Sequence, residues 1–96
     1  MAQQIKHCIN SRSFSIVLNG KKSVLEYRQL PNKVLEFFHT EVPVEHRGQG
    51  YAKQLVKEGF KFADAEHYKV LPTCPYVAKY AQESATAHEK ELVVEK

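Results

Sequence analysis

The sequence predicts a small α/β domain with a mixed sheet, built as an antiparallel three-strand meander, a crossover helix, a parallel strand and a second helix. Three observations support this fold class. Residues 13–42 alternate apolar and polar side chains between turn sequences, as strands do. Residues 51–64 repeat apolar side chains with the period of a helix. The 96 residues, 43% hydrophobic and 26% charged, suffice for one core, so we treat residues 1–96 as a single domain.

The meander is marked by its turns. Asn19-Gly20 is typical of a two-residue hairpin, and Pro31-Asn32-Lys33 separates the next two apolar runs. Pro43 has no N–H group for a sheet ladder, so the third strand ends or bulges there. The three strands are expected over residues 14–18, 23–30 and 34–42.

A strand–helix–strand unit follows the meander. The amphipathic helix opens at Tyr51, and the short apolar run Lys69–Pro72 can rejoin the sheet only beside the third strand and parallel to it. If a ligand enters between these parallel strands, they must separate at their carboxyl ends and leave backbone groups free for it.

The last part of the chain holds a second helix. Pro75 fits the first turn of a helix over residues 76–83, with Thr73 or Cys74 near its cap. Residues 84–96 are mostly polar. We expect them to form a loose tail or to dock through a short apolar strand near its end.

Composition limits the class of partner. The net charge of +3 comes with 14 Lys and Arg residues that are scattered along the chain, which favours a small anionic ligand over nucleic acid. No apolar run approaches the roughly 18 residues of a membrane span, so no membrane association is expected. No set of His, Cys and carboxylate residues has metal-ligand spacing, so no metal is expected.

Cysteine usage and the leading segment bear on the compartment. Cys8 and Cys74 are the only cysteines, and we expect free thiols in an intracellular, cytoplasmic protein. Because Glu26 is the first acidic residue, the leading segment also has the charge balance of a mitochondrial transit peptide, which is a secondary alternative.

The stretch from His46 to Ala52, HRGQGYA, contains two of the four glycines and lies at the mouth of the predicted helix. In α/β units, anions bind at the N-terminus of the crossover helix, where several amides lack partners. The glycines let a phosphate approach the backbone, and Arg47 adds a forked cation. The loop alone leaves a simple turn open as the alternative.

The spacing of this loop also carries a resemblance. Arg47-Gly48-Gln49-Gly50-Tyr51-Ala52 matches the Arg/Gln-x-x-Gly-x-Gly/Ala pattern with which GNAT N-acetyltransferases hold the pyrophosphate of acetyl-CoA. With His39-Thr40-Glu41-Val42-Pro43 before it and Cys74-Pro75-Tyr76-Val77 after it, the chain resembles the short, single-domain, YjdJ-like branch of that superfamily over about residues 13–80.

The resemblance implies a minimal GNAT fold, acetyl-CoA as cosubstrate and an amine as acetyl acceptor. This branch lacks the helical segment that helps to bind substrate in larger relatives, so the resemblance does not identify the acceptor. A non-catalytic acyl-CoA-binding or protein-interaction domain is the alternative function. The CoA-binding residues implied are Thr40, Val42, Arg47, Gly48, Gln49, Gly50, Tyr51, Ala52 and Tyr80.

Acetyl transfer needs a base, an oxyanion site and a group near the leaving thiolate. Deprotonating a lysine-like amine with a pKa near 10.4 at neutral pH costs about 4.6 kcal/mol. His39 and Glu41 share a strand face and are the candidate bases, unless they are ordinary structural or solvated side chains. By the resemblance, the backbone of 40–42 binds the oxyanion, and Tyr76 or Tyr80 lies near the sulfur, unless these are ordinary half-buried aromatic residues.

Cys74 is the further catalytic candidate. It stands at the expected junction of the parallel strand and the second helix, where a thiol pKa is lowered. It could accept the acetyl group, act as an acid, line the thioester pocket, or be an inert buried cysteine. We expect its thiol to react faster than that of Cys8, which lies in an irregular stretch.

Overall fold

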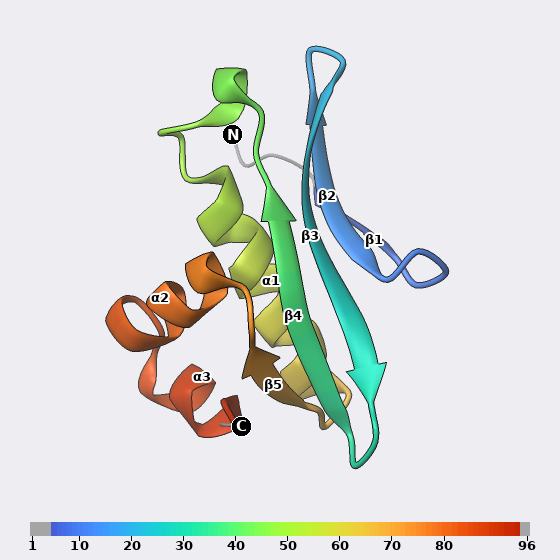
Figure 1. The fold of residues 1–96 in the computed structure, drawn as a ribbon, viewed down its shortest axis with the longest axis vertical. Helices are drawn as coiled ribbons and strands as arrows, with labels where there is room; N and C mark the ends of the chain where they lie inside the picture. The colour runs from blue at the N-terminus through green and yellow to red at the C-terminus, as the bar shows by residue number, and fades with distance from the viewer. Residues whose placement is uncertain (1–4, 95–96) are drawn as a thin grey trace.

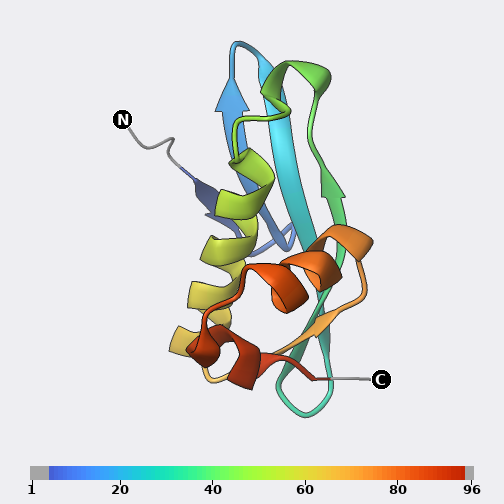
Figure 2. The same ribbon diagram turned by 90° about the vertical axis from the view of Figure 1, so that its left-hand side faces the viewer.

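The structure, a computed structural model, describes residues 5–94. It has a five-stranded sheet in the order β1-β2-β3-β4-β5, with the helices gathered on one face (Figures 1 and 2). The elements are β1 (Lys6–Cys8), β2 (Ser13–Leu18), β3 (Lys21–Leu30), β4 (Val34–Glu41), the 3-10 helix η1 (Val44–His46), α1 (Tyr51–Ala65), β5 (Lys69–Pro72), α2 (Pro75–Glu83) and α3 (Ala87–Leu92).

The predicted meander is confirmed as β2, β3 and β4, which pair antiparallel. Asn19 and Gly20 both take positive φ in the β2–β3 turn, at 53° and 75°, as a two-residue hairpin of this type requires. β3 begins at Lys21, two residues before the predicted start, and β4 ends at Glu41, one residue before the predicted end. The sheet also gains a strand that was not predicted, because β1 pairs antiparallel with β2.

A β-bulge in β4 changes which side chains face the helices. Tyr27 pairs with Phe37 and Glu26 pairs with His39, so Phe38 is an extra residue in β4 without a partner in β3. Before the bulge, Phe37 faces the helices and is fully buried. After it, Thr40 is the residue on that side, opposite the buried Leu25. A strand without the bulge would have placed odd-numbered residues there throughout.

The core lies between the sheet and α1. The helix buries the face predicted from its apolar period, with side chains such as Leu55, Val56 and Phe60 less than 2% exposed. Gly59 lets the helix approach the sheet closely, because a Cβ atom there would lie 2.7 Å from the Phe37 ring. Among residues 5–94, no helix is both long enough and apolar enough to cross a bilayer.

The parallel strand and the second helix are confirmed. β5 runs parallel to β4, from the pair Val34–Lys69 to the pair Phe37–Pro72. Cys74 is the N-cap residue of α2, and Pro75 opens that helix. Proline is favoured at this position because the first helical N–H group needs no partner within the helix.

The C-terminal segment carries a helix in addition to the expected contact with the sheet. The Thr86 hydroxyl accepts from the Glu89 amide and the Glu89 side chain accepts from the Thr86 amide, which makes a capping box for α3. Val93 then forms a parallel bridge with Val70 of β5. The spacing Thr86-x-x-Glu89 is therefore the sequence signal for this helix. Residues 95–96 of the predicted tail lie outside the described residues.

Candidate active site

The parallel strands separate where the sequence predicts a ligand crevice. The last paired residues of β4 and β5 are Phe37 and Pro72, and the Cys74 amide then donates to the Phe37 carbonyl oxygen at 3.0 Å. Beyond this point β4 continues to Glu41, while the chain leaves β5 and turns into α2 (Figure 1). Residues 38–41, which we call the upper part of β4, thus have no strand beside them on this edge.

A pocket of about 420 Å³ opens between the upper part of β4, the glycine loop and the first turns of α1 and α2. It brings together most of the residues predicted to bind CoA, and Tyr76 with them. The lining residues are Thr40, Val42, His46, Arg47, Gly48, Gly50, Tyr51, Ala52 and Tyr76.

The glycine loop presents bare backbone at the mouth of α1. Gly48 and Gly50 have φ of 77° and 80°, values that residues with a Cβ atom rarely adopt, and Gly50 is the N-cap of the helix. The first bond of the helix runs from the Gln54 amide to the Gly50 carbonyl oxygen. No side chain caps α1 and its first turn has no acidic residue, so its first amides are left for an anion.

Two loop side chains are fixed by local hydrogen bonds. Arg47 is exposed, and its Nε donates to the Val42 carbonyl oxygen at 3.1 Å, which holds the guanidinium at the pocket. Gln49 donates to the Glu45 carbonyl oxygen at 3.0 Å and accepts from the Tyr51 hydroxyl at 3.3 Å. Gln49 therefore braces the loop and does not line the pocket.

His46 is a pocket residue that sequence reasoning missed. Its ring is 2% exposed, and Nε2 donates to the Leu18 carbonyl oxygen at 3.2 Å. Nδ1 lies 2.6 Å from the hydroxyl of Ser23, so the ring ties the glycine loop to the β2–β3 hairpin. These partners lie 28 and 23 residues away in the chain, and no local pattern signals them.

Cys74 lies beside the pocket but is covered. It is 7% exposed, and its Sγ lies 3.5 Å from the Thr40 hydroxyl. Burial works to raise the pKa of the thiol, but hydrogen bonds with Thr40 and the backbone of Val77 and Tyr76 outweigh it and leave the pKa below its usual value. Cys8 is exposed in β1, so the expectation that Cys74 is the faster-reacting thiol does not fit this burial.

The two candidate tyrosines have different surroundings. Tyr76 lines the pocket and is 37% exposed, and partial burial raises the pKa of its hydroxyl. Tyr80 is 3% exposed, and its hydroxyl donates to Glu89 Oε1 at 2.8 Å, towards α3. Burial and the Glu89 carboxylate raise the Tyr80 pKa far above its usual value. The structure therefore does not bring Tyr80 to this pocket, and its hydroxyl is held towards α3 instead.

The predicted bases lie on the other face of the sheet. His39 and Glu41 share a face, as predicted, and His39 Nε2 lies 4.0 Å from Glu41 Oε1 and 3.9 Å from Glu26 Oε1. The bulge at Phe38 turns this pair away from the helices and leaves Thr40 facing Cys74. His39 and Glu41 consequently do not line the pocket beside the glycine loop.

Glu36 is a second residue that sequence reasoning missed. Its side chain is only 13% exposed, and it lies on the helix-free face of β4, next to the point where β5 ends. Glu36 Oε2 accepts from the Thr73 hydroxyl at 2.6 Å, and Oε1 lies 3.5 Å from an Arg28 nitrogen. Thr73 directly precedes Cys74, so a fixed carboxylate lies beside the crevice. Within residues 5–94, no group of three or more His, Cys, Asp or Glu side chains is placed to hold a metal ion.

Comparison with known proteins identifies the family. The model of the GCN5-related N-acetyl-transferase family matches residues 13–90, which is most of the chain. The chain belongs to the GCN5-related N-acetyltransferase family. The chain is 39% identical to Protein NATD1 of Xenopus tropicalis and 37% identical to that of Gallus gallus, over 84% of this chain and 76% of each relative. Protein NATD1 of Homo sapiens is 36% identical over 84% of this chain and 74% of the relative.

The GNAT fold is shown by a solved structure as well. A GCN5-like protein from Staphylococcus aureus, solved by NMR, superposes with a TM-score of 0.75 at 22% sequence identity and covers 98% of this chain and 90% of that one. The family match includes the glycine loop and Cys74. The minimal GNAT fold expected from the sequence is thereby confirmed.

Proposed function

We propose that this protein transfers the acetyl group of acetyl-CoA to the nitrogen of an amine. One observation carries the proposal: the pocket joins the glycine loop and free amides of α1 to the part of β4 that β5 leaves unpaired. The side of the pocket formed by the glycine loop and α1 suits a pyrophosphate, since it offers backbone donors, a helix N-terminus and Arg47. The side formed by β4 offers Thr40 and backbone groups along which the pantetheine arm can lie.

The acceptor amine needs a base near the thioester, and Glu36 is the carboxylate best placed for it. It is held by Thr73 on one side and Arg28 on the other, beside the end of β5. A carboxylate with a fixed direction loses little entropy when it takes a proton from a bound amine. Glu41, whose side chain is 73% exposed, is free to move and lies farther along β4.

The transfer step follows from this arrangement. The nitrogen lone pair forms a bond with the thioester carbonyl carbon, and the amine proton passes to Glu36. The carbon–sulfur bond then breaks, and the CoA thiolate takes a proton from water or from Tyr76. The Tyr76 hydroxyl is protonated at neutral pH, since its ordinary pKa is near 10 and partial burial raises it further. The products are the N-acetylated amine and CoA.

Calorimetry with CoA tests the first half of the proposal. Gly50→Val brings a Cβ atom into a position with φ of 80° and into the path of the pyrophosphate, and Arg47→Glu replaces attraction by repulsion. Each should weaken CoA binding by about 10- to 150-fold, which corresponds to roughly 1.5–3 kcal/mol. Lys61→Glu, at an exposed site on α1, has the same charge change and is the matched control. Unchanged affinity in a folded Gly50→Val protein would overturn the assignment of the pocket.

Release of CoA thiol from acetyl-CoA in the presence of a panel of amines tests the second half. Glu36→Gln should lower transfer by roughly 100-fold with CoA affinity retained, whereas Glu41→Gln should have a much smaller effect. Cys74→Ala separates the roles left open for the thiol, since a nucleophile or an acid would lose transfer and a lining residue would not. Tight CoA binding with no amine accelerating thiol release would instead support a non-catalytic acyl-CoA-binding domain.

A further inference from the structure

A cavity of about 340 Å³, which we call the α1-end cavity, lies at the end of α1 that is remote from the glycine loop. The β1–β2 turn, strands β3 and β4, and the end of α1 with the residues that follow it form its walls. It shares no lining residue with the pocket assigned to CoA, and α1, about 22 Å long from its 15 residues, runs between the two. Figure 2 shows this helix running along the sheet from the glycine loop towards the end where β3 turns into β4.

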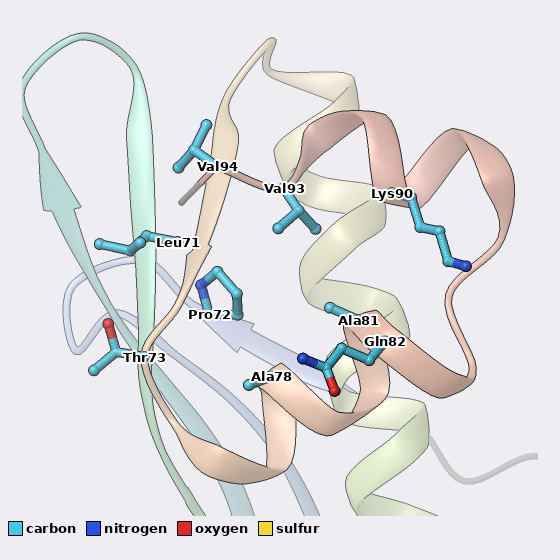
Figure 3. A pocket seen from close by; sticks show the side chains of 9 residues that line it. All are labelled: Leu71, Pro72, Thr73, Ala78, Ala81, Gln82, Lys90, Val93 and Val94. Atoms are coloured by element: carbon cyan, nitrogen blue, oxygen red, sulfur yellow. The ribbon is translucent and has the colours of Figure 1, made fainter. Parts of the chain in front are cut away.

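A larger cavity, of about 510 Å³, lies at the outer edge of β5 but has no converging polar groups (Figure 3). Lys90 is the charged residue in its lining, and Figure 3 shows the Gln82 amide directed away from it. The Thr73 side chain lies on the other side of β5 from Pro72. This cavity therefore does not indicate a class of ligand, whereas the lining of the α1-end cavity does.

The apolar surface of the α1-end cavity is largely aromatic. The Phe62 ring lies 6.2 Å from the Tyr68 ring and 6.1 Å from the Tyr27 ring, centroid to centroid, and all three rings line the cavity. Leu35 adds a fully buried side chain, whereas Ile9 is 67% exposed. A ligand that covers Ile9 and the half-buried rings removes apolar surface from water. Flat walls of this kind suit an aromatic group.

Arg12 adds an unpaired cation to this lining. Arg28 lies 3.5 Å from a carboxylate oxygen of Glu36, and the guanidinium of Arg47 donates to a carbonyl oxygen. In the part of the chain that the structure describes, the Arg12 guanidinium has neither an ion pair nor a hydrogen bond. Burial raises the pKa of the Tyr27 hydroxyl and the Arg12 charge opposes the rise, so the guanidinium lies near that hydroxyl.

The backbone holds Arg12 at the cavity in a strained conformation. Its amide donates to the Ile9 carbonyl oxygen at 3.2 Å, and its carbonyl oxygen accepts from the Tyr27 amide at 3.0 Å. Its φ is 52°, a value that glycine adopts more readily than residues with a Cβ atom. Strain of this kind is typical of positions where a side chain has a function.

Tyr68 and Gln29 leave further donors free in the same lining. The Gln29 amide donates to the Tyr68 hydroxyl oxygen, so the phenolic proton is not used in that bond. The Gln29 amide group also has a second N–H. A guanidinium, a phenolic O–H and an amide N–H together are suitable donors for a carboxylate.

Glu66 gives the cavity a negative charge as well. It is the C-cap residue of α1, it is exposed, and within residues 5–94 its carboxylate has no ion-pair partner. Arg12 and Glu66 leave the lining without net charge, so a simple anion or a simple cation meets one attractive and one repulsive group. Lys33 Nζ already lies 4.1 Å from the centroid of the Tyr68 ring, which disfavours an aromatic cage for a lone cation. A zwitterion satisfies both charges.

We propose that the α1-end cavity binds a free aromatic α-amino acid in its zwitterionic form. Arg12 and the Tyr68 hydroxyl bind the carboxylate, Glu66 binds the ammonium group, and the ring of the ligand packs against Phe62. The volume of the cavity, at the lower end of the range for small-molecule sites, suits a single amino acid. This site is additional to the proposed acetyl transfer and does not depend on it.

Calorimetry with L-phenylalanine and three analogues, in the absence of acetyl-CoA, tests the ligand class. 3-Phenylpropionate lacks the amine, 2-phenylethylamine lacks the carboxylate, and L-alanine lacks the ring. L-Phenylalanine should bind about tenfold or more tightly than each analogue, because each analogue leaves one part of the lining without a partner. An analogue that binds as tightly as L-phenylalanine would overturn the proposal, and so would a lack of L-phenylalanine binding at millimolar concentration.

Two charge-removing variants locate the effect. Arg12→Gln should abolish the advantage of L-phenylalanine over 2-phenylethylamine and keep its advantage over 3-phenylpropionate, whereas Glu66→Gln should do the reverse. The matched controls are Lys22→Gln and Glu83→Gln, which remove the same charges at exposed positions outside the lining and should keep both advantages. Advantages that survive in Arg12→Gln and Glu66→Gln, or that are lost equally in the controls, would overturn the proposal.

Arg12→Gly separates binding from folding. Glycine favours a φ of 52°, so this variant should be as stable as the parent protein in urea while it binds L-phenylalanine about tenfold more weakly. NMR gives the location, since L-phenylalanine should shift the methyl signals of Ile9 and Leu35 and leave that of Ala52 in the pocket assigned to CoA unchanged. Shifts centred on Ala52 would overturn the proposal. The glycine-loop variants test the proposed function separately, because no step here involves CoA.

Discussion

Replacing His46 by alanine should destabilise the fold and loosen the glycine loop together. The ring is 2% exposed and joins two parts of the chain, through Leu18 at 3.2 Å and Ser23 at 2.6 Å. His46→Ala removes both hydrogen bonds and leaves the fully buried Ser23 hydroxyl without this partner. Two lost bonds, one of them leaving a buried polar group, correspond to about 2–4 kcal/mol of unfolding free energy. Since the same ring positions the loop, CoA affinity should also fall, by about tenfold.

Urea unfolding followed by circular dichroism measures the first effect, and calorimetry with CoA measures the second. His39→Ala is the matched control, because that side chain is 47% exposed and its carboxylate contacts lie at the surface. It should change stability by no more than about 0.5 kcal/mol. A His46→Ala protein as stable as His39→Ala would refute the structural role assigned to this ring. Ser23→Ala completes a double-mutant cycle, and the two variants should be strongly non-additive.

Three further predictions concern packing, thiols and pH. Gly59→Ala should destabilise the protein by about 1–3 kcal/mol in urea unfolding, because the new Cβ atom would lie 2.7 Å from the Phe37 ring, and unchanged stability would contradict this close approach. Iodoacetamide should modify Cys8 before Cys74, since Cys8 is exposed and hydrogen bonds from a nearby serine lower the pKa of its thiol, and mass spectrometry showing the reverse order would contradict the burial of Cys74. The His88 pKa should lie above 6.5, because the carboxylate of Asp64 on α1 hydrogen-bonds its ring. The contribution of this contact to stability is therefore complete below about pH 6.5 and is lost as pH rises through the folded-state pKa. An NMR titration midpoint of His88 at or below 6.5 would contradict the contact.

Features with local signals were predicted from the sequence. The turn at Asn19-Gly20 needs two residues that tolerate positive φ, and the Asn-Gly pair by itself predicts the hairpin. The glycine loop is similar, because its glycines and the helix that follows are contiguous in the chain. Pro75 marks the start of α2 through the chemistry of a single residue. In each case the physical cause lies within a few residues of its effect.

Features that depend on distant partners were not predicted. The bulge at Phe38 arises from the pairing of β3 with β4, and it moves His39 and Glu41 to the face opposite Thr40. A strict period of two cannot reveal such a shift of one residue. The position of the Glu36 carboxylate likewise depends on a hydroxyl 37 residues away in the sequence.

The incorrect prediction for Tyr80 and the unpredicted helix α3 have the same cause, because both depend on contacts between separate segments. The sequence pattern predicts Tyr80 as a half-buried helix residue. Only the packing of α3 shows that the Tyr80 hydroxyl donates to the Glu89 carboxylate. The capping box of α3 was visible in the sequence as Thr86 and Glu89, three residues apart, but a short polar helix has little apolar pattern to support it.

The placement of all three α-helices on one face bears on how the products of the proposed acetyl transfer would leave. Within residues 5–94 the opposite face of the sheet has no second layer, and Val17 there is 63% exposed. Enzymes that enclose their substrates often turn over only as fast as a covering loop reopens. In the acetyl transfer proposed above, β4 borders solvent directly on this face, so turnover is expected to be limited by chemistry or by CoA dissociation. The same openness gives water a path to the thioester, and slow acceptor-independent hydrolysis of acetyl-CoA is the expected cost of a two-layer fold.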